Sequence, residues 1–168
     1  MTPEDEVLEV SAPEQFKALA HPMRHRLLFA LGQHAATISQ LAASLGSHKG
    51  NIAHHLKVLR EAGLVRPAGT AHVRGGTEQY YQRTARALHL AAEHYPDNLP
   101  IAFRAVAEEI ANAEPDPFLV LRNIRLTATQ VEQITAVLTE IADDTPDAGP
   151  DAPRYGLLLG LYRPHPGR

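Results

Sequence analysis

The chain has 168 residues and a formal net charge of −3, a length that suits one ordinary domain or a small domain with an accessory one. It contains no cysteine, which excludes disulfides, thiolate metal sites and cysteine nucleophiles. No apolar run approaches the roughly 20 residues of a membrane-spanning helix. The acidic N-terminus lacks a signal pattern, so we expect a cytoplasmic protein with no membrane partner.

Charge is distributed unevenly along the chain. Residues 1–15 carry five acids and no Lys or Arg, and residues 87–168 carry six Lys or Arg against twelve acids. Between them, residues 16–86 carry ten Lys or Arg against two acids, a local balance of +8. A basic block between acidic ends is typical of a polyanion-binding segment. Chance patterning is the alternative.

The first part of the chain predicts three successive helices. A capping-box pattern at Ser11–Glu14 opens a helix through residue 20, and Pro22 begins a second helix that ends near Gly32. A second capping box at Thr37–Gln40 opens a compact helix that stops at Gly46. A turn and a further amphipathic helix follow, which together predict a helix-turn-helix.

That further helix is expected to begin at Ser47, which caps it, and to end before Gly63, where a left-handed cap is favoured. Its apolar stripe consists of Ile52, Leu56 and Leu59. At about 100° per residue, the opposite face carries small and polar residues without acids. These are Gly50, Ala53, His54 and Lys57, with Asn51 at the edge. Such a face can lie in a major groove without repelling phosphate.

Alternating residues on either side of Gly75-Gly76 predict a β-hairpin with a two-residue turn at those glycines. This hairpin would form a wing beside the helix-turn-helix. Tyr80 and Tyr81 lie on its second strand. They are expected to pack against the core, and stacking on nucleic-acid bases is the alternative.

Two more helices are predicted at residues 84–95 and 97–114, broken at Tyr95-Pro96. Apolar residues recur along the second at alternating spacings of four and three, as in a short coiled-coil seam. The residues are Leu99, Phe103, Val106, Ile110 and Ala113. This seam serves either to dimerise the protein or to pack on the protein's own core.

The C-terminal third predicts a β-α-β segment. An apolar strand at Phe118–Leu126 precedes a helix that a third capping box opens at Thr127, and Tyr155–Tyr162 forms a last strand. The acidic, proline-rich residues 143–153 form the intervening loop. The segment suits dimer packing or a small-molecule pocket, and the pattern does not distinguish the two.

Residues 16–84 resemble the winged helix-turn-helix domain of the ArsR-type bacterial repressors, in a branch with a longer C-terminal region. The matching segments are Ala18–Arg24, Ile38–Ala42, Ile52–Leu59, Ala62–Val65 and the wing Arg74–Tyr81. The resemblance implies a homodimer that binds an inverted repeat in double-stranded DNA and whose binding an effector alters. Metal-sensing members often carry cysteine on the helix before the recognition helix. The corresponding residues 37–42 have none.

We therefore expect a mainly α, α+β fold: an acidic tail (1–10), a winged helix-turn-helix domain (11–95) and a dimerisation or accessory region (96–168). Asn51 is expected to pair with adenine, and His54 to reach guanine or phosphate. The other expected DNA contacts come from the N-terminus of the recognition helix, from basic side chains and from the wing. They are Ser47, His48, Lys49, Lys57, Arg66, Arg74, Gly75 and Thr77.

Rival functions have weaker support in the sequence. A Zn or Ni sensor would use His89, Glu93, His94 and Asp97, and a small-molecule sensor would use the C-terminal region. His21, His25 and His55 are expected to pack or cap within the fold. No phosphate loop, nucleophile elbow or zinc-protease helix is present, so neither catalysis nor a cofactor is expected.

Overall fold

A computed structural model describes residues 7–32, 34–73, 76–91, 95–113, 117–146, 148–149, 151–153 and 155–164. The chain divides into two compact units, Met1–Pro117 and Phe118–Arg168. The first unit includes the long helix that follows residue 95, whereas the sequence placed the domain boundary before that helix. Among the described residues, no helix is both long and apolar enough to cross a membrane.

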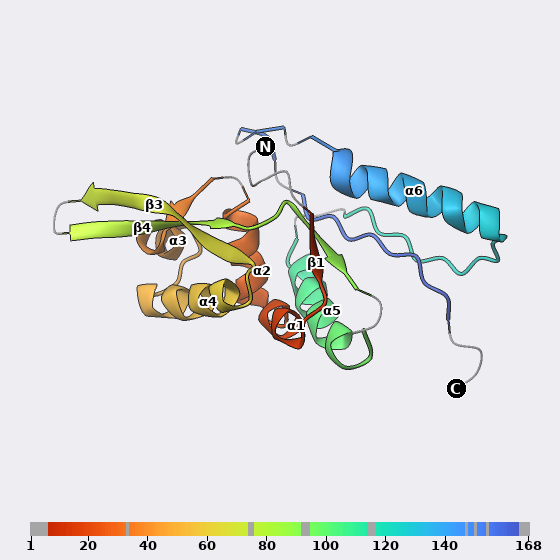
Figure 1. The fold of residues 1–168 in the computed structure, drawn as a ribbon, viewed down its shortest axis with the longest axis horizontal. Helices are drawn as coiled ribbons and strands as arrows, with labels where there is room; N and C mark the ends of the chain where they lie inside the picture. The colour runs from red at the N-terminus through yellow and green to blue at the C-terminus, as the bar shows by residue number, and fades with distance from the viewer. Residues whose placement is uncertain are drawn as a thin grey trace. The chain divides into compact units, whose positions relative to one another are not determined.

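The first unit combines five helices with short strands, as the α+β expectation requires (Figure 1). Its helices are α1 (Pro13–Leu19), α2 (Pro22–Ala30), α3 (Ile38–Ser44), α4 (Lys49–Glu61) and α5 (Tyr95–Ala111). Its strands are β1 (Val7–Val10), β2 (Ala36–Thr37), β3 (Val65–Val73), β4 (Gly76–Arg83) and β5 (Ala87–Leu90).

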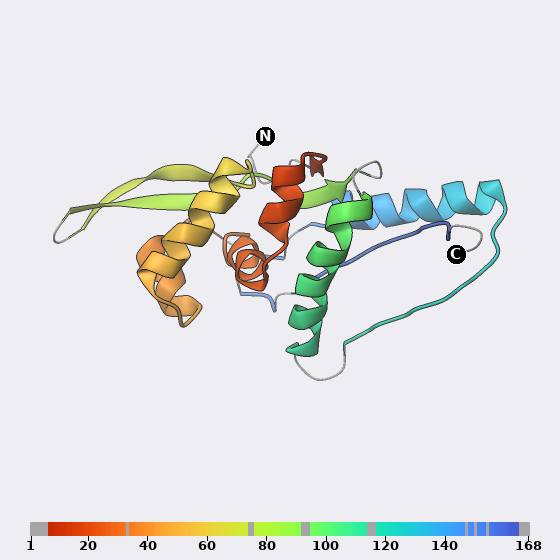
Figure 2. The ribbon, with the colours of Figure 1, turned by 90° about the horizontal axis from the view of Figure 1, so that it is seen from below.

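The wing is an antiparallel sheet in the order β2-β4-β3. The register pairs Val73 with Gly76, and residues 74–75 lie outside the described residues. The prediction that Gly76 lies in the turn was wrong, because Gly76 is the first residue of β4, where it has a positive φ that glycine adopts readily. Figures 1 and 2 both show the β3–β4 hairpin extending beyond α3 and α4.

The helix predicted at residues 84–95 was wrong. Residues Ala87–Leu90 form β5, which pairs in parallel with β1. The strand β1 falls within the stretch expected to be an acidic tail. Neither short segment has a strong strand pattern of its own, but each satisfies the backbone hydrogen-bonding groups of the other. The pairing also buries Val10 completely.

A single apolar cluster organises the first unit. Phe16 of α1 and Leu27 of α2 are fully buried in it, together with Ile52 and Leu59 of α4. Full burial of side chains of this size stabilises a fold by about 1.5–3 kcal/mol each. This shared core fixes α4 against the rest of the unit and leaves its opposite face exposed.

Helix capping explains where the shorter helices begin. Thr37 is the N-cap of α3: its hydroxyl accepts from the Gln40 amide, and the Gln40 side chain accepts from the Thr37 amide, which confirms the predicted capping box. The box predicted for α1 was wrong in its cap residue. The N-cap is Ala12, with Pro13 as first helical residue, and Gln15 accepts from the amides of Ser11 and Ala12.

Helix α5 packs against α1 and α2 of the same chain, and Figure 2 shows α1 and α5 side by side. Among the α5 residues whose burial the structure describes, Ala105 is buried, with 2 % of its surface exposed. Of the predicted seam, Phe103 remains 45 % exposed. Val106 and Ile110 of the same seam are half-buried, so the described part of the seam is partly covered and partly exposed in the single chain.

The second unit contains α6 (Ala128–Asp144). The predicted capping box is confirmed, because the Thr127 side chain accepts from the Gln130 amide and Gln130 Oε1 accepts from the Thr127 amide at 3.0 Å. The two strands predicted beside this helix were wrong for the single chain: residues 118–126 and 155–162 belong to neither sheet of the described part of the chain. An isolated strand has no ladder partner to satisfy its backbone groups.

Candidate nucleic-acid interface

The expected recognition helix is α4, which buries Ile52, Leu56 and Leu59 as its apolar stripe predicts. Its N-cap is His48, so the prediction that Ser47 caps the helix was wrong by one residue. Gly63 follows the helix with φ of +72°, the left-handed conformation expected after its last turn. The chain then enters β3, and this turn couples α4 directly to the wing.

The face of α4 opposite the core is exposed over its whole length. The exposed side chains are Lys49, Asn51, His54, Lys57, Arg60 and Glu61, and the one acid among them is Glu61, the last residue of the helix. A Cβ added to Gly50 would meet nothing within 4 Å. Nothing inside the protein therefore requires glycine at position 50, although a helical glycine costs about 0.5–1 kcal/mol relative to alanine.

Ser47 holds the side chain of Asn51. The Asn51 Nδ2 donates to Ser47 Oγ at 3.0 Å. A side-chain amide has two N–H donors and one carbonyl acceptor, so this bond leaves one donor and the acceptor for another molecule. Those two groups are what bidentate pairing with adenine uses. The sequence named both residues but did not anticipate that one orients the other.

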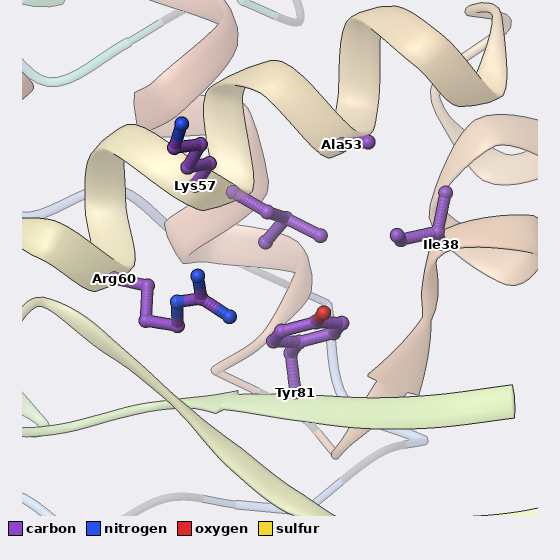
Figure 3. A pocket seen from close by; sticks show the side chains of 6 residues that line it. Ile38, Ala53, Lys57, Arg60 and Tyr81 are labelled. Atoms are coloured by element: carbon purple, nitrogen blue, oxygen red, sulfur yellow. The ribbon is translucent and has the colours of Figure 1, made fainter.

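A small pocket of about 170 Å³ lies between α4 and the wing. Apolar atoms of Ile38, Ala53 and Leu56 line it together with Tyr81, Lys57 and Arg60. Figure 3 shows Tyr81 reaching from β4 toward α4, and the Arg60 side chain extending from the helix toward it. The volume lies below the 300–1,000 Å³ typical of small-molecule sites. The notable feature of the pocket is that two cations, Lys57 and Arg60, lie at its border.

Arg60 is a basic residue of this surface that the sequence reasoning missed. It lies in the last turn of α4, is exposed, and follows Lys57 by three positions. That spacing places the two cations on neighbouring turns of one helix face. The spacing could have identified Arg60 from the sequence alone. Tyr81 packs against the buried cluster, as expected from the sequence.

Lys57 has an acidic neighbour on its own helix. Its Nζ lies 3.8 Å from Glu61 Oε1, and both side chains are more than 60 % exposed. Pairs of this kind contribute about 0.2–1 kcal/mol. Glu61 therefore partly neutralises the lysine but does not fix it in place.

The wing supplies two further expected contacts. The Arg66 guanidinium lies against the side-chain amide of Gln82, its partner across the β3–β4 ladder. Thr77 Oγ1 lies 3.3 Å from His72 Nδ1, again across the ladder. Arg74 and Gly75 lie outside the described residues.

A contact between Ser39 and Glu78 joins the helix-turn-helix to the wing. The Ser39 hydroxyl of α3 donates to Glu78 Oε1 of β4. This bond lowers the pKa of the Glu78 carboxyl, with smaller contributions from Thr37 and from the charge of Lys49. The one acid on the wing strand is therefore turned toward α3.

Three histidines meet between α2 and α4. The rings of His21 and His55 have centroids 4.4 Å apart, and those of His54 and His55 are 5.4 Å apart. His21 Nδ1 also accepts from the Met23 amide at 3.1 Å, so it caps α2. The prediction that His21 and His55 pack or cap within the fold is confirmed.

His55 is 6 % exposed, and its Nδ1 has no hydrogen-bond partner among the described residues. Burial lowers the pKa of His55 from 6.5 to about 4, with further contributions from His21, Arg24 and His54. The imidazole of His55 is therefore neutral in the folded protein near neutral pH.

The histidine cluster considered for a metal is not a helical face. His89 lies on β5 and is exposed, whereas Glu93 and His94 lie outside the described residues. Within the described part of the chain, no group of three or more His, Asp or Glu side chains has the geometry to hold a metal ion.

One family model matches part of the chain. Residues 21–66 match the family described as bacterial regulatory protein, arsR family. This segment begins at the N-cap of α2 and ends in β3, so it contains α2, α3 and α4. No curated protein matches the chain.

Three solved structures illustrate the similarity. A homodimeric winged helix-turn-helix DNA-binding domain from Mycobacterium bovis is 22 % identical over 59 % of this chain and 75 % of its own, with a TM-score of 0.37. The transcriptional repressor BigR of Xylella fastidiosa is 20 % identical over 61 % and 86 %, at 0.37. The cadmium sensor CmtR of Mycobacterium tuberculosis is 27 % identical over 66 % and 100 %, at 0.36. All three scores are below 0.5, so the assignment depends on residues 21–66.

Proposed function

We propose, from the premise that residues 21–66 carry the DNA-binding region of the arsR family of bacterial regulatory proteins, that this winged helix-turn-helix transcription regulator is a homodimeric repressor of an inverted-repeat operator. The observation that carries the proposal is the exposed outer face of α4, which presents Lys49, Asn51, His54 and Lys57 and carries an acid only at the last residue of the helix, Glu61. A helix of this kind fits the major groove of B-DNA, where each base pair presents a distinct pattern of donors and acceptors.

Base reading is assigned to Asn51 and His54. Asn51, held by Ser47 at 3.0 Å, would present its free amide groups to an adenine, and the exposed His54 would reach guanine or a phosphate. Gly50 lies beside them and has no side chain. Its place on this face suits close approach of the helix to the DNA.

Attraction that does not depend on sequence is assigned to the surrounding cations. Lys49 lies at the N-terminus of α4 beside Ser47 and His48, where free backbone amides favour phosphate. Lys57 and Arg60 lie farther along the helix, and the wing residues Arg66, Arg74, Gly75 and Thr77 would meet the flanking backbone. Each such phosphate contact makes binding weaker at higher salt.

Two copies of α4 would enter successive major grooves about 34 Å apart, which requires a two-fold symmetric dimer and an inverted-repeat site. Repression would follow if the operator overlaps a promoter. An effector that changes the separation of the two helices would release the DNA. We propose a small molecule as that effector and assign no site to it.

The test is a titration of the purified protein with duplex DNA from upstream of its own gene, followed by fluorescence anisotropy. The proposal expects binding to that duplex to be at least about 10³-fold tighter than to a random duplex, and expects the affinity to fall as salt rises. A duplex with one half-site removed is the matched control and is expected to bind much more weakly. Equal affinity for upstream and random duplexes would contradict the proposal.

A further inference from the structure

The second unit, Phe118–Arg168, exposes far more apolar surface than a soluble monomer normally does. Phe118 and Leu121 are 93 % and 90 % exposed, and Tyr155 is 86 % exposed. Other large apolar side chains of the same unit are also exposed: Leu119, Val120, Ile124, Val131, Val137, Ile141, Leu157, Leu158, Leu161 and Tyr162. Their combined area is on the order of 1,000 Å².

The backbone of this unit also contains segments without sheet partners. Residues 118–126 and 155–162 are rich in apolar residues but belong to no sheet in the described part of the chain. One segment precedes α6 in the sequence and the other follows it, and Figure 1 draws both as coil without strand arrows. Unpaired segments of this composition are templates for strand pairing with another chain.

Helix α6 is well formed but uncovered. Its capping box is complete, and yet none of its 17 residues is buried. Val131, Ile134, Leu138 and Ile141 form one stripe along it, and two of them, Val131 and Ile141, are each 40 % exposed. A helix with an open apolar stripe and two apolar strands without a ladder are the parts of one two-layer core.

We propose that this core forms between two copies of the chain. Residues 118–126 and 155–162 of one copy pair with the same segments of a second copy, and the α6 helices cover the resulting sheet. The inference rests on the dimer of the proposed function and assigns that dimer's main contact to the second unit.

The exposed apolar area of the second unit supports a second copy of the chain as the molecule that covers it. Standard protein interfaces bury about 800 Å² per partner, whereas the largest apolar patch on a typical monomer is about 300–600 Å². The exposed surface of the second unit thus matches what one symmetric contact requires. An isologous contact also uses the same patch on both copies, so the chain supplies the whole interface by itself.

Charge supports the same occupant. Residues 118–168 carry five Arg and six acids, so two copies repel each other little. The charges are also separated by element: Arg122 and Arg125 belong to the first apolar segment and Arg163 directly follows the second, whereas Glu132, Glu140, Asp143 and Asp144 belong to α6. The helix of one copy over the strands of the other therefore brings opposite charges together.

The experiment measures the mass of the full chain in solution by light scattering at micromolar concentration. The test variant is Phe118→Lys with Leu121→Lys. The matched control, Ala136→Lys with Thr139→Lys, adds the same two charges at exposed positions on the opposite face of α6. We expect a wild-type dimer, a dimeric control and a monomeric test variant whose far-ultraviolet circular dichroism retains the helices of the first unit.

Hydrogen exchange of the amides in residues 118–126 and 155–162 gives a second readout. We expect these amides to be protected in the wild-type dimer and to lose that protection in the test variant. Protection that persists in a monomer would show pairing within one chain and would overturn the inference. A test variant that remains dimeric would also overturn it, while leaving the proposed function intact. A monomeric wild type would overturn the dimer of the proposed function as well.

Discussion

The imidazole of His21 lies 4.4 Å, ring centre to ring centre, from that of His55, and this contact joins the N-cap of α2 to the buried side of the recognition helix. Arg24 and His54 add positive charge around the same ring. Near neutral pH, His55 is therefore packed at this contact as a neutral imidazole. His55 therefore contributes both to the stability of the fold and to the placement of α4.

A loss of stability in acid follows from this contact. The pKa of His55 falls from 6.5 to about 4 on folding, so between these values the unfolded chain binds a proton that the folded chain does not. The contribution is complete above pH 6.5 and is lost as the pH falls toward 4, by at most about 3 kcal/mol. Urea unfolding at pH 7.5 and 4.5 measures it. His55→Phe should reduce the difference, and His34→Phe, at an exposed position, should not.

Ser47 is predicted to matter for DNA and not for stability. Since His48 is the N-cap of α4 and Ser47 instead accepts from Asn51, Ser47→Ala should leave the free energy of unfolding nearly unchanged. It should weaken specific DNA binding by about 1 kcal/mol, the value of one hydrogen bond. Thr37→Ala removes a true cap and should cost about 1 kcal/mol of stability. The reverse pattern in denaturation and anisotropy measurements would contradict the roles assigned here.

Gly50→Ala is expected to move stability and binding in opposite directions. The added methyl meets nothing within 4 Å in the protein, and alanine is the better helix former, so unfolding should become harder by up to about 1 kcal/mol. The same methyl would crowd the DNA and should cost about 1–3 kcal/mol of binding. Unchanged affinity for the cognate duplex would mean that Gly50 does not approach DNA.

Removing the acid that faces Lys57 should strengthen DNA binding. Glu61→Gln frees the lysine from a pair of 3.8 Å, and we expect up to about a fivefold gain at low salt, corresponding to about 1 kcal/mol. Glu108→Gln is the matched control, because it removes an equivalent i,i+4 partner from Arg104 on α5 and changes the net charge equally. An equal gain in both variants would attribute the effect to net charge alone.

The local features of the DNA-binding region were predictable from the sequence. The stripe of Ile52, Leu56 and Leu59, the box at Thr37 and the turn at Gly63 each depend on neighbouring residues, and the structure contains all three. Errors of one residue occurred at Ser47 and at Gly76, each of which has a neighbour that can take the same local role.

The features that were missed depend on distant partners. Residues 87–90 have good helix formers, yet they form a strand because Val7–Val10 pairs with them from the other end of the unit. The apolar strands expected at 118–126 and 155–162 have no ladder in one chain, and by our inference their partner is a second molecule. Arg60 was missed because a basic residue in the last turn of a helix is usually explained by its interaction with the terminal carbonyls.

The most direct test uses a double variant that carries both Asn51→Ala and His54→Ala. Its affinities for a cognate and a random duplex are measured beside those of the wild type. Anisotropy titrations at fixed salt give both affinities. The account predicts that the cognate affinity falls by about 10–100-fold or more, since each base contact contributes about 1–3 kcal/mol, while the random-duplex affinity changes little. Equal losses on both duplexes would contradict the assignment of the α4 face as the surface that reads DNA.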